Sequence, residues 1–287
     1  MALKDLLVYV DQTDDALERL RLAADLAIRH DSHLTALYAR EWSRAQLDRR
    51  KAAELGLISA RGLSTLDQEI AAEISSAADR IGAMLTELNR VRGLRAELLG
   101  FDGAAANVLP QYARYADLCI LGQDGPDGPA SVNYTFSEQL LFVTGRPVLF
   151  VPGGRAFVSL GRHIAVAWNS SRPAARSLSD ALTLIERAER TTVIMINPSG
   201  FIHAHEGPPG EPMVEHLRRH GATVEAVRIE EVPHGDIAAR LQREALTRGA
   251  DLLVAGAFGH PRLWEKMLGG VTHELIADMA LPILMSH

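Results

Sequence analysis

The chain has 287 residues, of which 47% are hydrophobic and 23% are charged, and its formal net charge is −6. These values exclude disordered and fibrous proteins, and the lack of excess cations excludes a general nucleic-acid binder. The length predicts about two domains, each large enough to bury a core of its own. Cys119 is the single cysteine, and no segment is typical of a signal peptide or a membrane span. The sequence therefore favours a cytoplasmic protein without a membrane partner.

The first half alternates apolar runs with amphipathic segments, a pattern typical of strands buried between helices. Apolar side chains recur at three- and four-residue spacing in residues 16–28, which predicts a helix, and a second helix is predicted at residues 104–115. The same periodicity within residues 41–92 predicts a long helical excursion between the second strand and the third. Strands are predicted at residues 6–10, 33–38, 95–99, 117–121 and 147–151.

The second half repeats this pattern after a linker at residues 152–155. Residues 117–122 (DLCILG) align with residues 251–256 (DLLVAG), and the last strands of the two halves also align. The strands of the second half are predicted at residues 164–168, 192–197, 223–229, 251–256 and 282–285. The chain is therefore interpreted as a tandem duplication, with a first domain at residues 1–153 and a second at residues 154–287.

Alternating strands and helices predict an α/β fold in which each half is a doubly wound, Rossmann-like parallel sheet of five strands. Such sheets bind ligands beyond the carboxyl ends of their strands, where the strand order reverses. In the second half this edge is predicted to hold Trp168, Asn169 and Ser170 after the first strand and Asn197 after the second. Trp168 suits stacking on a base, although a tryptophan at a strand end is as often part of the core.

A glycine-rich segment follows the fourth strand of the second half and ends at the start of the last helix. Its glycines let backbone approach a bulky anion, its basic side chains supply positive charge, and the helix start leaves backbone N–H groups unpaired. These features predict a phosphate-binding cradle. Its residues are Gly256, Gly259, His260, Arg262, Gly269, Gly270, Val271 and Thr272.

The spacing of Gly256, Gly259 and Gly269 resembles the nucleotide-binding signature of the universal stress protein family, G-x2-G-x9-G-[S/T]. The resemblance covers essentially the whole chain, as two such domains in tandem. It implies a stress-response protein that binds ATP, ADP or AMP in its second domain and acts as a nucleotide-dependent regulatory protein on a protein partner. It further implies an internal pseudo-dimer in which the last strands, residues 147–151 and 282–285, pair with each other. Whether two chains also form a homodimer is left open.

Two residues depart from the family pattern. Gly270 stands where the signature has Ser or Thr, so that one hydroxyl donor is missing, and Thr272 is its nearest substitute. Asn169 stands where nucleotide-binding members usually have an acidic residue, and an amide is a poorer partner for Mg²⁺ than a carboxylate. Participation of Mg²⁺ is therefore left open, and no other cofactor is expected.

The first half is predicted to have lost its nucleotide site. It retains the acidic residue, Asp11, and the first glycine, Gly122, but Tyr134 aligns with Gly269. A tyrosine there would fill the space for phosphate, and Asp124 and Asp127 would repel an anion. We therefore expect one nucleotide per chain.

Two alternative functions are kept. One is an α/β nucleotide hydrolase that uses the same cradle, but no residue is an evident general base, so at most weak ATPase activity is expected and no catalytic residue is assigned. The other is an interaction module without a nucleotide. The histidine pairs His203/His205 and His216/His220 have spacing that zinc would accept, but no third ligand is identifiable, and no metal site is predicted.

Overall fold

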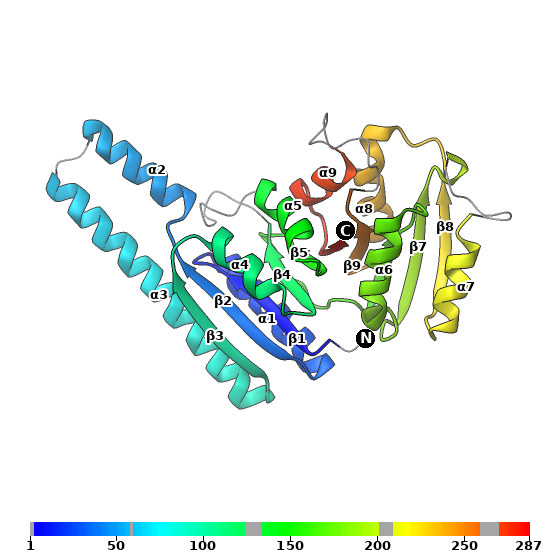
Figure 1. Ribbon diagram of the computed structural model, residues 1–287, viewed down its shortest axis with the longest axis horizontal. Coiled ribbons are helices and arrows are strands. Elements are labelled where there is room, and N and C mark those ends of the chain that lie inside the picture. The colour runs from blue at the N-terminus through cyan, green and yellow to red at the C-terminus, as the bar shows by residue number, and fades with distance from the viewer. Residues whose placement is uncertain (1–2, 58–59, 124–133, 201–208, 259–269) are drawn as a thin grey trace. The chain divides into compact units, whose positions relative to one another are not determined.

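The computed structural model describes residues 3–57, 60–123, 134–200, 209–258 and 270–287 (Figure 1). The chain divides into two compact units, Leu3–Leu140 and a second that contains Leu141–His287. Each unit combines a parallel sheet with helices on its faces, which confirms the predicted doubly wound α/β fold. Within the described residues, no helix is long and apolar enough to cross a membrane.

In the first unit the strands lie in the order β3-β2-β1-β4, and every pairing between neighbours is parallel. The apolar runs read from the sequence are the buried strands of this sheet, because β1 and β4 have helices on both sides. The elements are β1 (Asp5–Val10), α1 (Asp14–His30), β2 (His33–Arg40), α2 (Arg44–Ala52), a π-helical turn (Ala53–Leu57), α3 (Ala60–Arg92), β3 (Arg95–Asp102), α4 (Ala105–Ala113), β4 (Leu118–Gly122) and α5 (Tyr134–Val143), the last of which crosses the unit boundary.

Local signals place the first helix. The side chain of Thr13 accepts a hydrogen bond from the Ala16 N–H and caps α1, which ends at Asp31 in the left-handed conformation (φ 53°). α1 buries the apolar stripe that includes Leu20 and Ala23 against β1 and β4. α1 and α3 contact each other on one face of this sheet, and α4 covers the other face (Figure 1).

The helical excursion between β2 and β3 is a pair of helices. Ser43 and Gln46 form a reciprocal capping box that begins α2. α2 and α3 run side by side as a hairpin whose far end extends beyond the strands of this unit (Figure 1). The predicted apolar stripe of α3 is buried at Ile70, Ile74 and Ile81, whereas the interruption of the excursion at Ala53–Leu57 was not predicted.

In the second unit the order is β8-β7-β6-β9-β10-β5, with all neighbours parallel except β10 and β5. The antiparallel pairing of Ile283 with Phe150 and of Met285 with Val148 confirms the expected pairing of the two last strands. The elements are β5 (Val148–Val151), β6 (His163–Ala167), α6 (Arg172–Ile185), β7 (Arg190–Ile196), a 3₁₀ turn (Pro198–Gly200), α7 (Glu211–Arg219), β8 (Val224–Ile229), a 3₁₀ turn (His234–Asp236), α8 (Ile237–Thr247), β9 (Leu252–Gly256), α9 (Val271–Ala277) and β10 (Ile283–Ser286).

β5 falls in the second unit, where it pairs with β10. The domain boundary predicted after residue 153 follows the sequence repeat, whereas the compact units divide before Leu141. The repeat boundary itself stays a prediction. α6 and α7 lie on one face of the second sheet, and α8 and α9 contact each other on the opposite face (Figure 1).

Candidate functional site

Those predicted site residues of the second unit that the structure describes lie at one edge of its sheet. Parallel strands end at the same edge, and β6, β7 and β9 end at Ala167, Ile196 and Gly256. Trp168 and Asn197 are the first residues after their strands. Four predicted residues, Gly259, His260, Arg262 and Gly269, lie outside the described residues, as do His203, His205, Asp124 and Asp127 and the side chain of Tyr134.

The turn between β6 and α6 carries three predicted residues. Asn169 is exposed, and its Oδ1 accepts a hydrogen bond from the Ser171 N–H at 3.1 Å. Ser170 adopts a left-handed conformation (φ 60°), and Ser171 caps α6 by accepting a hydrogen bond from the Ala174 N–H at 3.3 Å. The Nδ2 of Asn169 has no hydrogen-bond partner among the described residues, so this amide is available to a ligand.

A glycine is required at position 256 by the packing of a neighbouring helix, which the sequence did not reveal. A Cβ atom at this position would lie 2.3 Å from the Ala174 backbone nitrogen and 2.4 Å from the Pro173 carbonyl carbon. The absent side chain of Gly256 therefore faces the first turn of α6 and lets that helix lie directly on β9. A contact between Gly256 and a ligand stays a prediction.

Two backbone N–H groups of the segment after Gly256 already donate hydrogen bonds within the protein. The Ala257 N–H donates to the Ser286 carbonyl at 2.9 Å, and the Phe258 N–H donates to the Thr272 Oγ1 at 3.1 Å. Thr272 is 8% exposed, so its hydroxyl oxygen fixes this loop while its hydrogen remains available for donation. These two N–H groups are therefore not available to an anion at this edge.

The start of α9 has further backbone N–H groups. Gly270 is the N-cap residue, its backbone is extended (φ −154°), and no side chain caps the helix. No atom of the described residues lies within 4 Å of the position that a Cβ of Gly270 would occupy. The first N–H groups of α9 therefore receive no capping side chain from the described residues.

Phe258 is a site residue that sequence reasoning missed, although its position between two signature glycines could have marked it. It adopts a left-handed conformation (φ 56°) that is strained for an aromatic residue. Its ring packs on Phe142, with ring centroids 4.7 Å apart, and Phe142 also contacts the His287 ring at 4.4 Å. This aromatic packing and the Thr272 hydroxyl hold the loop in its strained conformation.

Asn197 has a structural role. Its backbone N–H donates to the Ile229 carbonyl at 2.7 Å, its Nδ2 donates to the Val232 carbonyl at 2.7 Å, and its Oδ1 accepts from the Val232 N–H at 3.0 Å. The side chain that was predicted to contact a ligand thus clamps the loop after β8.

The corresponding edge of the first unit is filled by its own side chains. Arg19, which is 4% exposed, donates from Nε to the Tyr9 carbonyl at 2.8 Å and pairs through Nη2 with the Asp11 Oδ2 at 2.9 Å. A Cβ at Gly122 would lie 1.9 Å from the Arg19 Nη1, so the guanidinium covers this glycine. In the sequence alignment of the halves, Arg19 corresponds to Ser177. The acidic residue of the family pattern is therefore bound to an internal cation.

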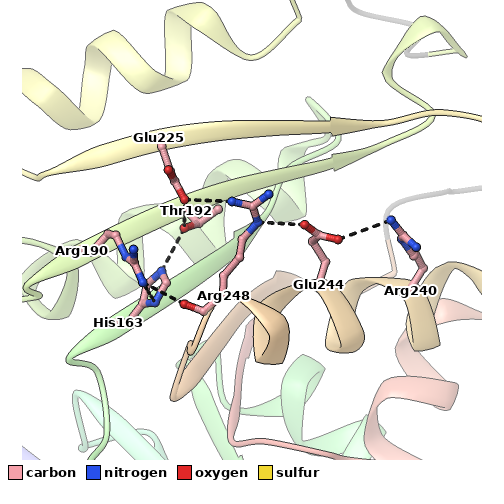
Figure 2. Close-up of polar contacts among 7 residues, drawn as sticks. All are labelled: His163, Arg190, Thr192, Glu225, Arg240, Glu244 and Arg248. Atoms are coloured by element: carbon pink, nitrogen blue, oxygen red, sulfur yellow. Dashed lines mark hydrogen bonds and ion pairs between the residues drawn. The ribbon is translucent and has the colours of Figure 1, made fainter.

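A polar network lies at the opposite, amino-terminal end of the second sheet (Figure 2). The His163 Nε2 lies 2.9 Å from the Thr192 Oγ1, whose hydroxyl donates to Glu225, and the Arg190 Nη2 lies 3.0 Å from the His163 Nδ1. Because arginine only donates, Nδ1 must accept, and the histidine is neutral with its proton on Nε2. Burial, and then the charge of Arg190, lower the pKa of His163 below 6.5.

Stability is expected to fall on acidification because of His163. Above pH 6.5 the histidine is neutral in both states, whereas below it the unfolded chain takes up a proton that the folded chain resists, at a cost of up to about 1.4 kcal/mol per pH unit. The free energy of unfolding, measured by urea denaturation between pH 8 and pH 5, should fall more steeply with falling pH for the natural chain than for His163→Gln. Parallel pH profiles of the two chains would contradict this assignment.

Comparisons with known proteins were made by sequence and by structure. Neither a family model nor a curated protein matches the sequence. A universal stress protein from Archaeoglobus fulgidus DSM 4304 matches with a TM-score of 0.68 and 14% identity over 98% of this chain and 95% of that chain. A putative universal stress protein from Pseudomonas aeruginosa UCBPP-PA14 matches with a TM-score of 0.54 and 18% identity, over 99% of this chain and 93% of that chain. A functionally unknown protein from Pseudomonas aeruginosa PAO1 matches with a TM-score of 0.56 and 18% identity, over 99% and 92%.

The chain has the universal stress protein fold. The fold is present as a tandem pair of units, and the match extends over both, because each full-length comparison covers nearly the whole chain. In both units of this universal stress protein fold the first strand of the repeat, β1 or β6, lies between the second and the fourth. At identities below 25%, the comparisons establish the architecture, and the ligand must be argued from the residues.

The described residues contain no group of three or more His, Cys, Asp or Glu side chains arranged to hold a metal ion. His216 and His220 stack edge to face with ring centroids 4.7 Å apart on the surface of α7. Burial, and then the neighbouring His220, lower the pKa of His216. The two histidines therefore form a ring contact.

Proposed function

We propose that this chain is a universal stress protein that binds an adenine nucleotide, ATP or the related ADP or AMP, at the carboxyl edge of its second sheet. The observation that carries the proposal is the start of α9 at Gly270, where no described side chain caps the helix, at the edge where the Asn169 Nδ2 has no partner among the described residues. Uncapped helix N–H groups and the positive end of the helix dipole suit a phosphate. The signature glycines around this point agree with that reading.

The first unit holds no nucleotide in this proposal. Asp11 is neutralised by Arg19, and both are nearly buried, so no acidic group is left to contact a ligand. One nucleotide per chain follows. Its arrival would change the surface that a protein partner contacts, so that the protein acts as a nucleotide-dependent regulator rather than as an enzyme.

A cytoplasmic location is part of the same proposal. Cys119 is buried in β4, and burial raises the pKa of its thiol to about 12. Such a thiol is an inert packing group that a reducing compartment leaves intact. Mg²⁺ is not required by the proposal, because Asn169 offers an amide where a carboxylate would hold the ion.

Replacement of Gly270 by aspartate is expected to weaken nucleotide binding without harming the fold. Asp is a favoured N-cap residue, and no atom of the described residues lies within 4 Å of its Cβ, so the stability of α9 should change by a few tenths of a kcal/mol at most. Its carboxylate would repel the phosphates, and we expect ATP to bind at least about tenfold more weakly. Binding is measured by fluorescence thermal shift with ATP and by acid extraction of copurified nucleotide.

Gly270→Ser is the matched control, because it restores the hydroxyl of the family signature at the same position. It should bind ATP at least as tightly as the natural chain. Equal binding of ATP by the Asp variant and the natural chain would contradict the proposed position of the site. Absence of ATP binding in all three chains would contradict the proposal that the protein binds an adenine nucleotide.

A further inference from the structure

A separate cavity of about 410 Å³ opens at the edge of the second sheet, between the loop after β8 and the first turns of α8. One wall is the loop at residues 229–233, and the other consists of Asp236, the residue before α8, and of Ala239, Arg240 and Arg243 within that helix. No residue of this β8–α8 cavity is among those predicted to bind the nucleotide. A volume of this size is in the range of small-molecule sites.

The loop wall is held in place before any ligand arrives. The side chain and backbone of Asn197 make three hydrogen bonds to Ile229 and Val232, all between 2.7 and 3.0 Å. The Glu230 carboxylate accepts hydrogen bonds from the Ser199 N–H and Oγ, at 3.1 and 2.9 Å. A pre-ordered wall lowers the entropic cost of binding.

The helix wall supplies two arginine side chains that have N–H donors without a partner among the described residues. Figure 2 shows Arg240 at the end of the polar network, where its Nη2 lies 3.4 Å from Glu244. Glu244 is bound more closely by Arg248, at 2.8 Å, and the buried Nε of Arg240 has no hydrogen-bond partner within the described residues. Arg243 is exposed and makes no ion pair with any described residue. Two guanidinium groups one helical turn apart suit a single carboxylate.

The same cavity carries unpaired negative charge. Glu231 and Asp236 are exposed, and neither side chain has a partner in the described part of the chain. Glu231 is also held in a left-handed conformation (φ 61°), which costs free energy for any residue except glycine. The strained backbone of Glu231 therefore lies in the wall of the cavity together with a carboxylate that has no partner among the described residues.

We propose that the β8–α8 cavity binds a small zwitterion of the amino-acid class. Arg240 and Arg243 bind the carboxylate of this ligand, and Glu231 and Asp236 bind its ammonium group. A nucleotide is disfavoured here because the two carboxylates repel several negative charges at once. The apolar wall residues Val232 and Ala239 leave room for the side chain of the ligand.

The test is a thermal-shift screen of the full chain against the proteinogenic L-amino acids at millimolar concentration, followed by calorimetry of those that stabilise it. The N-acetyl and the amide derivatives of each hit serve as ligand controls, because each lacks one of the two charges. We expect at least one amino acid to bind and both derivatives to bind at least about tenfold more weakly. Failure of every amino acid to bind, or equal binding of a derivative, would overturn the proposal.

Three variants locate the ligand. Arg243→Ala and Glu231→Gly should each bind the amino acid found in the screen about tenfold more weakly. Glu231→Gly should also leave the unliganded chain no less stable, because glycine relieves the strained backbone. Arg219→Ala is the matched control, since Arg219 is an exposed arginine of α7 outside the cavity, and it should bind as the natural chain does. Undiminished binding in the two cavity variants would place the ligand elsewhere. Neither measurement depends on ATP.

Discussion

Replacing Gly256 with alanine is expected to lower the free energy of unfolding by about 3 kcal/mol. The added Cβ would lie 2.3 Å from the Ala174 nitrogen and 2.8 Å from the Ala174 Cα, and these atoms belong to helix backbone. Backbone cannot rotate away as a flexible side chain can, so α6 must shift on β9. Urea denaturation of the variant and the natural chain measures the difference.

Gly235→Ala is the control for this prediction. Nothing lies within 4 Å of the added Cβ at Gly235, which also lies outside the predicted nucleotide site. Its free energy of unfolding should change by less than about 0.5 kcal/mol. If the two alanine variants unfold at the same urea concentration, the close packing of α6 on Gly256 is wrong.

Replacing Arg19 with methionine is expected to destabilise the chain by about 3 kcal/mol or more. Methionine keeps much of the volume but leaves Asp11, which is 11% exposed, without its cation, and leaves the Tyr9 carbonyl without its donor. Removal of one partner of a buried pair costs more than the pair contributes, because an uncompensated charge stays behind. Chemical denaturation measures the loss.

Two further chains separate this ion pair from an ordinary surface pair. Asp11→Asn combined with Arg19→Met should recover part of the lost stability, because the buried charge is then gone. Arg162→Met removes an exposed pair with Glu189, whose side chains are 62% and 66% exposed, and should cost less than about 1 kcal/mol. If Arg19→Met lowers the free energy of unfolding no more than Arg162→Met does, the assignment of Arg19 as a buried ion-pair partner of Asp11 is wrong.

The strands and the repeat could be predicted because they depend on local pattern. Continuous apolar runs such as residues 6–10 and 164–168 became β1 and β6 to within a residue or two, and the aligned last strands do pair. The register of that pairing and the break between α2 and α3 could not be predicted. Both are decided by contacts between residues that are distant in sequence, which periodicity does not report.

The individual site residues were harder to interpret than the fold. A glycine at the end of β9 suits both a ligand and a neighbouring helix, and only the packing of Ala174 distinguishes the two. The same holds for Asn197, whose amide binds a loop more than thirty residues away. Arg19 lies within the helix predicted at residues 16–28, and nothing in the local sequence shows that its side chain turns inward to Asp11. Motif position could indicate the edge of the sheet, but not the partner of each side chain.

The most direct test of nucleotide binding by the second unit is a calorimetric titration of the purified full chain with ATP. The expected result is a saturable heat with a stoichiometry of one ATP per chain, because Arg19 and Asp11 satisfy each other in the first unit while no described side chain caps the start of α9 in the second. A stoichiometry of two would contradict the closed first site, and the absence of any heat, with no nucleotide released by acid from the purified protein, would contradict nucleotide binding itself.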